Sequence, residues 1–157
     1  MKNIFYYETQ IGIIGIAQND EGITNLYIAD KLSSEGMKIR ETPLIKEAAD
    51  QLKDYLSGKR LAFDLPLAPQ GTDFQTKVWD ELQRIPYGHT HSYKQLAEKI
   101  GKPTAARAIG MANNKNPILI IIPCHRIIGK DGSLVGYAGG LNMKEQLLKM
   151  EKRHQNY

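Results

Sequence analysis

Cysteine and long apolar runs are scarce in this chain of 157 residues. Its single cysteine, Cys124, cannot form an internal disulfide, so a disulfide-stapled fold is excluded and nothing requires an oxidising compartment. No apolar run approaches the roughly 18 residues that a membrane span needs, and the first residues lack a secretory signal pattern. We therefore expect a cytoplasmic protein with no membrane partner.

The rest of the composition is that of an ordinary globular protein, with 41% hydrophobic and 24% charged residues. This balance excludes a disordered or fibrous chain, and the length suits one domain or two small ones. Charge is uneven: residues 1–74 hold 8 Lys and Arg against 11 Asp and Glu (net −3), and residues 75–157 hold 13 against 6 (net +7). A basic half suits a polyanion but also fits a plain solvated surface, so charge leaves both open.

The first predicted domain, residues 1–69, is a small antiparallel sheet with one helix. Short β-branched and aromatic runs at 4–7, 11–17 and 23–29 are separated by turn-forming clusters, as in hairpins.

Helical spacing then follows over 42–57, with Thr42 as N-cap, Pro43 in the first turn and Gly58 as the stop. The Pro-rich stretch 61–72 indicates an extended linker, where we place the domain boundary.

The second predicted domain, residues 70–157, is mainly helical. One helix begins at Thr72, and a last helix begins with a capping-box pattern at Asn142. The apolar run 118–122 is too short for a helix and indicates a buried extended segment.

Two further helices, starting at Ser92 and Thr104 and joined by a turn with Gly101, outline a helix-turn-helix. The second consists almost wholly of small residues with one cation, Arg107, so it can approach another surface closely. Such pairs also occur in proteins that never bind DNA, so the pattern alone leaves DNA binding and plain packing open.

The cysteine lies in the run Pro-Cys-His-Arg at 123–126. A lone cysteine is most often an inert core residue, but here His125 supplies a base and Arg126 favours a thiolate. A nucleophilic cysteine needs such help, because a free thiol of pKa about 8.5 is little ionised at neutral pH. Neighbours in a strand point to opposite faces, so Cys124 and His125 can cooperate only in a bend or through a bridging water.

A glycine-rich loop follows at 129–140, and its one aromatic residue, Tyr137, could stack on a flat ligand; the alternative is a flexible connector. His89 and His91 are two residues apart and the chain has no Cys-x-x-Cys pair, so we expect no metal site.

Taken in order, these segments resemble the O6-alkylguanine-DNA alkyltransferase family. The resemblance is strong over about residues 70–152 and looser over 1–69. Its segments are Gly-Thr-Asp-Phe-Gln-Thr-Lys-Val-Trp at 71–79, Ile-Pro-Tyr-Gly at 85–88, Ser-Tyr-Lys-Gln-Leu-Ala at 92–97, Ala-Arg-Ala at 106–108, Pro-Cys-His-Arg at 123–126, Gly-Tyr-Ala-Gly-Gly at 136–140 and Leu-Leu-Lys-Met-Glu at 147–151.

The resemblance implies an α/β (α+β) protein with a ribonuclease-H-like N-terminal domain and a winged-helix-like C-terminal domain. It implies DNA repair by irreversible, single-turnover transfer of an alkyl group from O6 of a flipped guanine to the protein's own cysteine, with O4 of thymine left open as a second substrate. No cofactor is implied. The expected partner is double-stranded DNA with O6-alkylguanine, bound by a monomer.

The resemblance also implies residue roles. Cys124 would accept the alkyl group, and His125 would deprotonate the Cys124 thiol through a water. Glu151 would orient the imidazole of His125, and Asn116 would organise the same hydrogen-bond network. The residues expected to bind DNA or the flipped base are Tyr93, Arg107, Arg126, Tyr137, Ala138 and Gly139. Among them, Arg107 would fill the gap that the flipped nucleotide leaves in the duplex. Some relatives have Ser at the position of Ala138, and the chain lacks the cysteines of a structural zinc found in others.

Two other function classes remain at this stage. A non-catalytic alkyltransferase-like or regulatory helix-turn-helix protein would bind DNA without chemistry, but such relatives lack the cysteine. A cysteine hydrolase would need an oxyanion site, and an adjacent Cys-His pair fits the usual spatially assembled dyad poorly.

Overall fold

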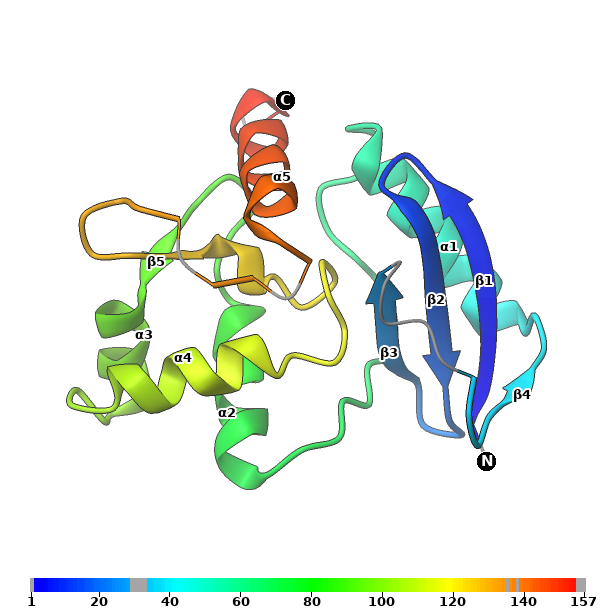
Figure 1. The fold of residues 1–157 in the computed structure, drawn as a ribbon, viewed down its shortest axis with the longest axis horizontal. Coiled ribbons are helices and arrows are strands. Elements are labelled where there is room, and N and C mark those ends of the chain that lie inside the picture. Colours follow the sequence, from blue (N-terminus) through cyan, green and yellow to red (C-terminus); the bar gives the residue numbers. More distant parts are fainter. Residues whose placement is uncertain (1, 29–33, 135, 138, 155–157) are drawn as a thin grey trace. The chain divides into compact units, whose positions relative to one another are not determined.

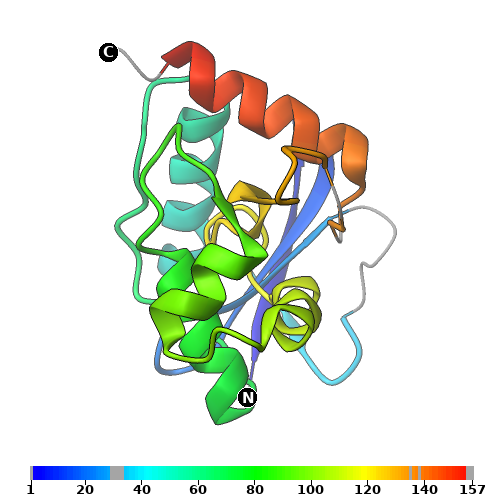
Figure 2. The same cartoon turned by 90° about the vertical axis from the view of Figure 1, so that its left-hand side faces the viewer.

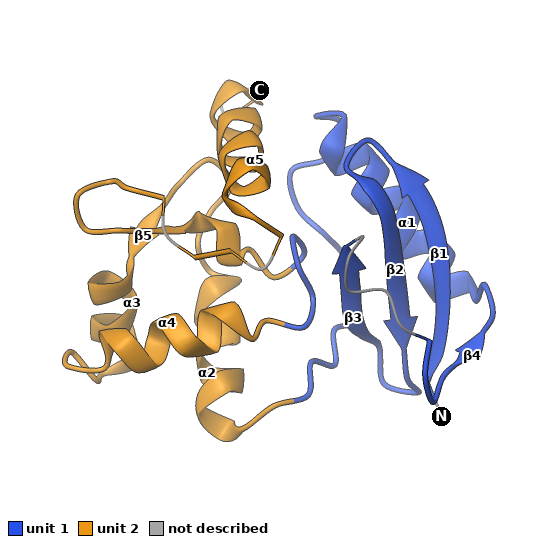
Figure 3. Ribbon diagram, in the orientation of Figure 1, with its two compact units in different colours: residues 1–70, 117–121 blue, residues 71–116, 122–157 orange. Residues whose placement is uncertain are grey.

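The structure, a computed structural model, describes residues 2–28, 34–134, 136–137 and 139–154. The chain forms two compact units (Figure 3), unit 1 with residues 1–70 and 117–121, and unit 2 with residues 71–116 and 122–157. In the described part of the chain, no helix has the length and apolar character of a membrane span.

Unit 1 is a four-stranded sheet with a helix packed on it (Figure 1). The antiparallel strands are β1 (Asn3–Thr9), β2 (Gly12–Gln18) and β3 (Ile23–Ile28), which confirms the expected hairpins. A two-residue strand, β4 (Lys38–Ile39), adds to the edge in parallel with β1, so the order is β3-β2-β1-β4. Its two residues are too few to show a strand pattern in the sequence.

Helix α1 (Pro43–Leu56) begins as predicted, because the Thr42 hydroxyl accepts a hydrogen bond from the N–H of Ile45 and Pro43 occupies the first turn. The sequence predicts an apolar face with Leu44, Ala48, Leu52 and Leu56; Ala48 and Leu52 are buried, whereas Leu44 and Leu56 are only half-buried. The apolar residues buried on α1 are Ile45, Ala48, Ala49, Leu52 and Tyr55.

Residues 117–121 belong to unit 1 although unit 2 surrounds them in the sequence. The N–H of Leu26 donates to the carbonyl of Pro117 at 2.9 Å, and Leu26 forms a parallel bridge with Ile118. This apolar segment therefore runs along the end of β3.

Unit 2 is mainly helical, as expected, and carries the short parallel pair β5–β6 (Figure 2). Its elements are α2 (Asp73–Leu82), β5 (His91–Ser92), α3 (Tyr93–Ile100), α4 (Ala106–Asn114), the 3-10 helix η2 (Cys124–Arg126), β6 (Ile127–Ile128) and α5 (Leu141–His154). In both views α5 lies at one end of this unit and α2, α3 and α4 lie together at the other. η2 packs against both α2 and α5.

Local signals fix two helix starts in unit 2. Thr72 and Ser92 each cap their helix with a complete capping box, and Gly101 ends α3 in the left-handed conformation at φ 82°. The indole N–H of Trp79 then joins α2 to α4 by donating to the carbonyl of Ala112 at 2.9 Å.

Two other predicted starts were wrong. α4 begins at Ala106 without a side-chain cap, because a turn closed by the N–H of Ala105 and the carbonyl of Lys102 follows α3 first. α5 begins at Leu141, which places Asn142 inside its first turn and not at its cap.

We expect Ser92→Ala to lower the free energy of unfolding by about 1 kcal/mol, because α3 loses the hydroxyl that caps it. Ser92→Thr keeps that hydroxyl and is the matched control. Trp79 is the only tryptophan of the chain and is buried, so its fluorescence during urea unfolding measures both variants. Equal loss in the two variants would contradict a role for the cap.

Candidate active site

Two tight turns precede η2, which begins at Cys124. Ile120 has φ 72°, rare for a β-branched residue, and a 2.8 Å hydrogen bond between its two neighbours closes a three-residue γ-turn there. At Pro123 (φ −82°, ψ 64°) the N–H of Cys124 closes the inverse turn onto the carbonyl of Ile122, also at 2.8 Å. The apolar run is thus buried as expected but bent, and Cys124 and His125 lie in a turn and not in a strand.

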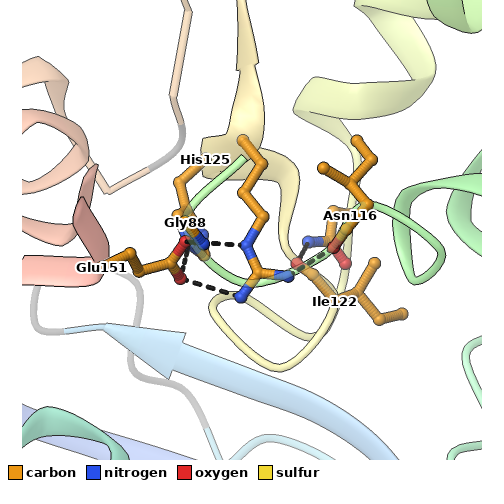
Figure 4. Close-up of polar contacts among 7 residues, drawn as sticks. Gly88, Asn116, Ile122, His125 and Glu151 are labelled. Carbon is orange, nitrogen blue, oxygen red and sulfur yellow. Dashed lines mark hydrogen bonds and ion pairs between the residues drawn. The ribbon is translucent and has the colours of Figure 1, made fainter. Parts of the chain in front are cut away.

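His125 and Glu151 form a fully buried pair, with 2.8 Å between Nε2 and Oε2 (Figure 4). Burial lowers the pKa of His125, and the contact with Glu151 only partly opposes this, so the imidazole is neutral. A neutral ring that meets a carboxylate through Nε2 carries its hydrogen there. The basic lone pair of His125 is therefore on Nδ1.

Arg126 holds the same carboxylate from another side. Its Nε donates to Oε1 of Glu151 at 2.8 Å, its Nη2 to Oε2 at 2.9 Å, and its Nη1 to the carbonyl of Ile85 at 2.6 Å. The sequence placed Arg126 among the DNA-binding residues. The structure directs its buried guanidinium inward, where all three nitrogens already have acceptors.

Glu151 is negatively charged at neutral pH in this network. Burial alone would raise the pKa of Glu151, but its hydrogen bonds to His125 and Arg126 lower that pKa to about 2. The N–H of Gly88 adds a longer contact to Oε1 at 3.4 Å. The imidazole therefore faces a carboxylate that can stabilise its protonated form.

Cys124 is only 2% exposed. Burial raises the pKa of its thiol to about 11, and a hydrogen bond from the Asn116 side chain and the charge of Lys144 act against burial. Asn116 is fixed in place because its Nδ2 donates to the carbonyl of Ile122 at 2.8 Å. With a pKa of about 11, roughly one thiol in ten thousand is ionised at pH 7, so any reaction must begin by removing the proton.

Two tyrosines predicted for the base pocket lie near this thiol. Tyr93 begins α3, packs on Gly110 of α4, and interacts electrostatically with Cys124. The ring of Tyr137 stands nearly perpendicular to that of His125, 6.4 Å away between centroids, and its hydroxyl is buried without a hydrogen-bond partner among the described residues.

The remaining predicted residues are placed as follows. A Cβ at Gly139 would lie 2.7 Å from the Tyr137 ring, so glycine allows the loop to fold against it. Arg107 is exposed on α4 and does not join the buried network. Ala138 lies outside the described residues.

Two buried residues of the site were not predicted. Lys144 of α5 is 0% exposed, and its Nζ donates to the carbonyl of Gly136 at 3.2 Å. The Nδ2 of Asn113 in α4 lies 3.5 Å from the carbonyl of Cys124. Spacing could have found Lys144, because it precedes Glu151 by seven residues and so shares its helix face; nothing in the sequence marks Asn113.

The chemistry that this arrangement supports is nucleophilic attack by sulfur. The thiol adjoins a neutral imidazole in the same turn, and a fixed carboxylate can stabilise the imidazolium. Over the described ranges, no group of three His, Cys, Asp or Glu side chains could hold a metal ion.

Family models match both halves of the chain: the ribonuclease-like domain of 6-O-methylguanine DNA methyltransferase over residues 4–69, and its DNA binding domain over residues 73–153. The methylated-DNA–protein-cysteine methyltransferase of Methanosarcina barkeri is 53% identical over 94% of this chain and 95% of its own. The constitutive one of Bacillus subtilis is 43% identical over 92% of each. The crystal structure of Mycobacterium tuberculosis OGT in complex with DNA is 43% identical and superposes with a TM-score of 0.91, covering 97% of this chain and 94% of that one.

The Glu151 network predicts how stability depends on acid. The pKa of Glu151 in the folded protein, about 2, lies below the value of about 4.3 expected in the unfolded chain. The carboxylate therefore contributes stability above the unfolded value, and this contribution is lost as the pH falls from about 5 toward 2.

We expect Glu151→Gln to remove much of that acid dependence and to cost about 3–5 kcal/mol at neutral pH, because Arg126 keeps a buried charge without its partner. The matched control is Glu145→Gln, on the same helix but with an exposed side chain paired to Lys149. Urea unfolding at a series of pH values measures both variants. If the unfolding free energy of Glu151→Gln fell with acid as steeply as that of the wild type, the low pKa assigned to Glu151 would be contradicted.

Proposed function

The chain belongs to the 6-O-methylguanine DNA methyltransferase family, and we propose that Cys124 receives the alkyl group, from O6 of a guanine in duplex DNA. The protein is a DNA repair enzyme that transfers alkyl groups from DNA to its own cysteine. Cys124 is supported as the acceptor because it is the one cysteine of the chain and adjoins a neutral base. The adjacency of Cys124 and His125 is the main observation in support of this proposal.

In the proposed reaction the Cys124 proton passes through a water molecule to Nδ1 of His125. The sulfur then attacks the alkyl carbon in line with its bond to oxygen. The S–C bond forms and the C–O bond breaks with its electron pair going to O6. The guanine anion takes up one proton from water and the imidazolium of His125 returns one to water, so the reaction balances. The thioether has no good leaving group, so each protein molecule reacts once and needs no cofactor.

Glu151 and Arg126 act together in this scheme. The carboxylate stabilises the imidazolium that forms on His125, at 2.8 Å from Nε2. Arg126 keeps the carboxylate ionised and fixed through two hydrogen bonds. Asn116 holds the sulfur by its hydrogen bond.

The protein binds DNA, and we propose that α4 is the element that enters the minor groove. Its exposed residues are Arg107, Ala108, Met111 and Asn114, and exposed Lys115 follows as its C-cap. A groove only ~6 Å wide favours small side chains such as Ala108. The target base cannot react inside the stack, so it is flipped out, and Arg107 fills the gap.

We propose that the flipped base binds beside Cys124 and contacts Tyr93 and Tyr137, both of which interact with that thiol. The backbone of Ala138 and Gly139 is proposed to bind the edge of the base. We also propose that the protein acts as a monomer, since every residue assigned to the reaction comes from unit 2 of one chain. A cytoplasmic location suits a single nucleophilic thiol, which must stay reduced until it is used.

Incubation with a duplex that contains O6-methylguanine should leave one methyl group per protein molecule on the peptide with Cys124. This follows from transfer to sulfur without regeneration, and mass spectrometry measures it without added cofactor. Cys124→Ser should bind the same duplex but gain no methyl group. Repair of more guanines than protein molecules would contradict the proposal.

Arg107→Ala should slow transfer from duplex DNA about tenfold, which corresponds to ~1.4 kcal/mol of lost support for the flipped state. Its reaction with free O6-methylguanine base, which needs no flipping, should be unchanged. Single-turnover rates with protein in excess measure both substrates.

The matched control is Lys115→Ala, which removes another exposed cation at the C-terminal end of α4. This variant should bind DNA more weakly, and the slope of log affinity against log salt concentration should fall by about one, as for the loss of one phosphate contact. The transfer rate at saturating DNA should change little. If Arg107→Ala slowed both substrates equally, the gap-filling role would have to be abandoned.

A further inference from the structure

Lys144 is a fully buried cation that the proposed reaction has not used. Lysine is almost never fully buried unless it is paired, because an ammonium group loses its hydration inside a protein. Its Nζ donates to the carbonyl of Gly136, which lies next to Tyr137 in the loop. This hydrogen bond fixes the position of the ammonium group, and the carbonyl itself carries no formal charge.

The position of Lys144 on α5 gives a reason to bury this charge. Lys144 and Glu151 are seven residues apart on the helix face that packs against η2. Glu151 meets His125 and Arg126 of that turn, and the charge of Lys144 acts on Cys124 and His125. One helix face thus presents an anion to the base and a cation to the nucleophile.

The titratable groups that surround this pair come from four elements. His125 belongs to η2, Tyr93 to α3, Tyr137 to the loop and Glu151 to α5. Burial lowers the pKa of Lys144 to about 8, and a negative charge on Cys124 would raise it again. Lys144 is therefore charged at neutral pH and becomes neutral on mild alkalinisation.

We propose that Lys144 is a positioning residue whose buried ammonium stabilises the thiolate of Cys124. The inference rests on the proposed function in taking Cys124 as the acceptor. Lys144 acts through the sulfur of Cys124 and requires no contact with DNA. A nearby opposite charge typically favours the charged form of an ionisable group by about one to three pKa units. The charge of Lys144 lowers the pKa of Cys124 and so offsets part of the burial that suppresses the thiolate.

The proposal predicts a distinctive pH profile for alkylation of Cys124 by iodoacetamide, followed by mass spectrometry. In the wild type the rate should rise about tenfold per pH unit at first and flatten near pH 8, the value to which burial lowers the pKa of Lys144. The rate flattens because above this pH Lys144 loses its proton. The fraction of protein that has both the Lys144 ammonium and the Cys124 thiolate then stops increasing.

Lys144→Met should react at least about tenfold more slowly at pH 7 and rise through pH 8 without a bend. Lys144→Arg keeps a charge that is not lost in this range, so it should stay fast and also lack the bend. Lys149→Met, which removes an exposed lysine from the same helix, is the matched control and should follow the wild type.

A uniform loss of rate in Lys144→Met with the bend retained would mean a purely structural role and would overturn the proposal. So would a wild-type profile that rises through pH 8 unbent, a result that needs no variant to fold. Iodoacetamide does not require DNA, so failure of the repair function would appear separately, as absence of transfer from O6-methylguanine by a thiol with the expected profile.

Discussion

The buried carboxylate of Glu151 is the interaction on which the arrangement of the site depends. An ionised carboxylate without hydration must be compensated by specific partners, and here they are His125 and the Nε and Nη2 groups of Arg126. These contacts tie α5 to η2 at a fixed register. They also decide which ring nitrogen of His125 carries the hydrogen, so one constraint sets both the local fold and the basic atom.

Features of the fold that are encoded locally could be predicted from the sequence. Thr42, Thr72 and Ser92 start their helices through hydroxyls that bond to backbone only three residues away, so a short window contains the whole signal. α4 has no such cap, and its start depends on the turn that leaves α3. The φ of 72° at Ile120 could not be read from any window, because a β-branched residue adopts it only when the surrounding structure imposes it.

The candidate site shows the same division. The adjacency of Cys124 and His125 indicated the chemistry, and the family resemblance brought in Glu151 from 26 residues further along the chain. The direction of Arg126 could not be foreseen, since a cation beside a nucleophile suits DNA or an internal carboxylate equally well in the sequence. Only the folded structure shows that Glu151 of α5 and the carbonyl of Ile85, which follows α2, accept hydrogen bonds from Arg126.

A protein that uses its nucleophile once gains from keeping it unreactive until the substrate arrives. Oxidants and stray electrophiles attack the thiolate, and burial of Cys124 keeps the thiolate scarce. The same burial would also suppress reaction with the alkyl group unless other groups favour ionisation within the pocket. In the proposed reaction the neutral imidazole accepts the proton, while the Asn116 hydrogen bond and the Lys144 charge favour the sulfur anion. Access and ionisation are thus controlled separately, so a thiol that is protected in the resting protein can still react with a base that enters the pocket.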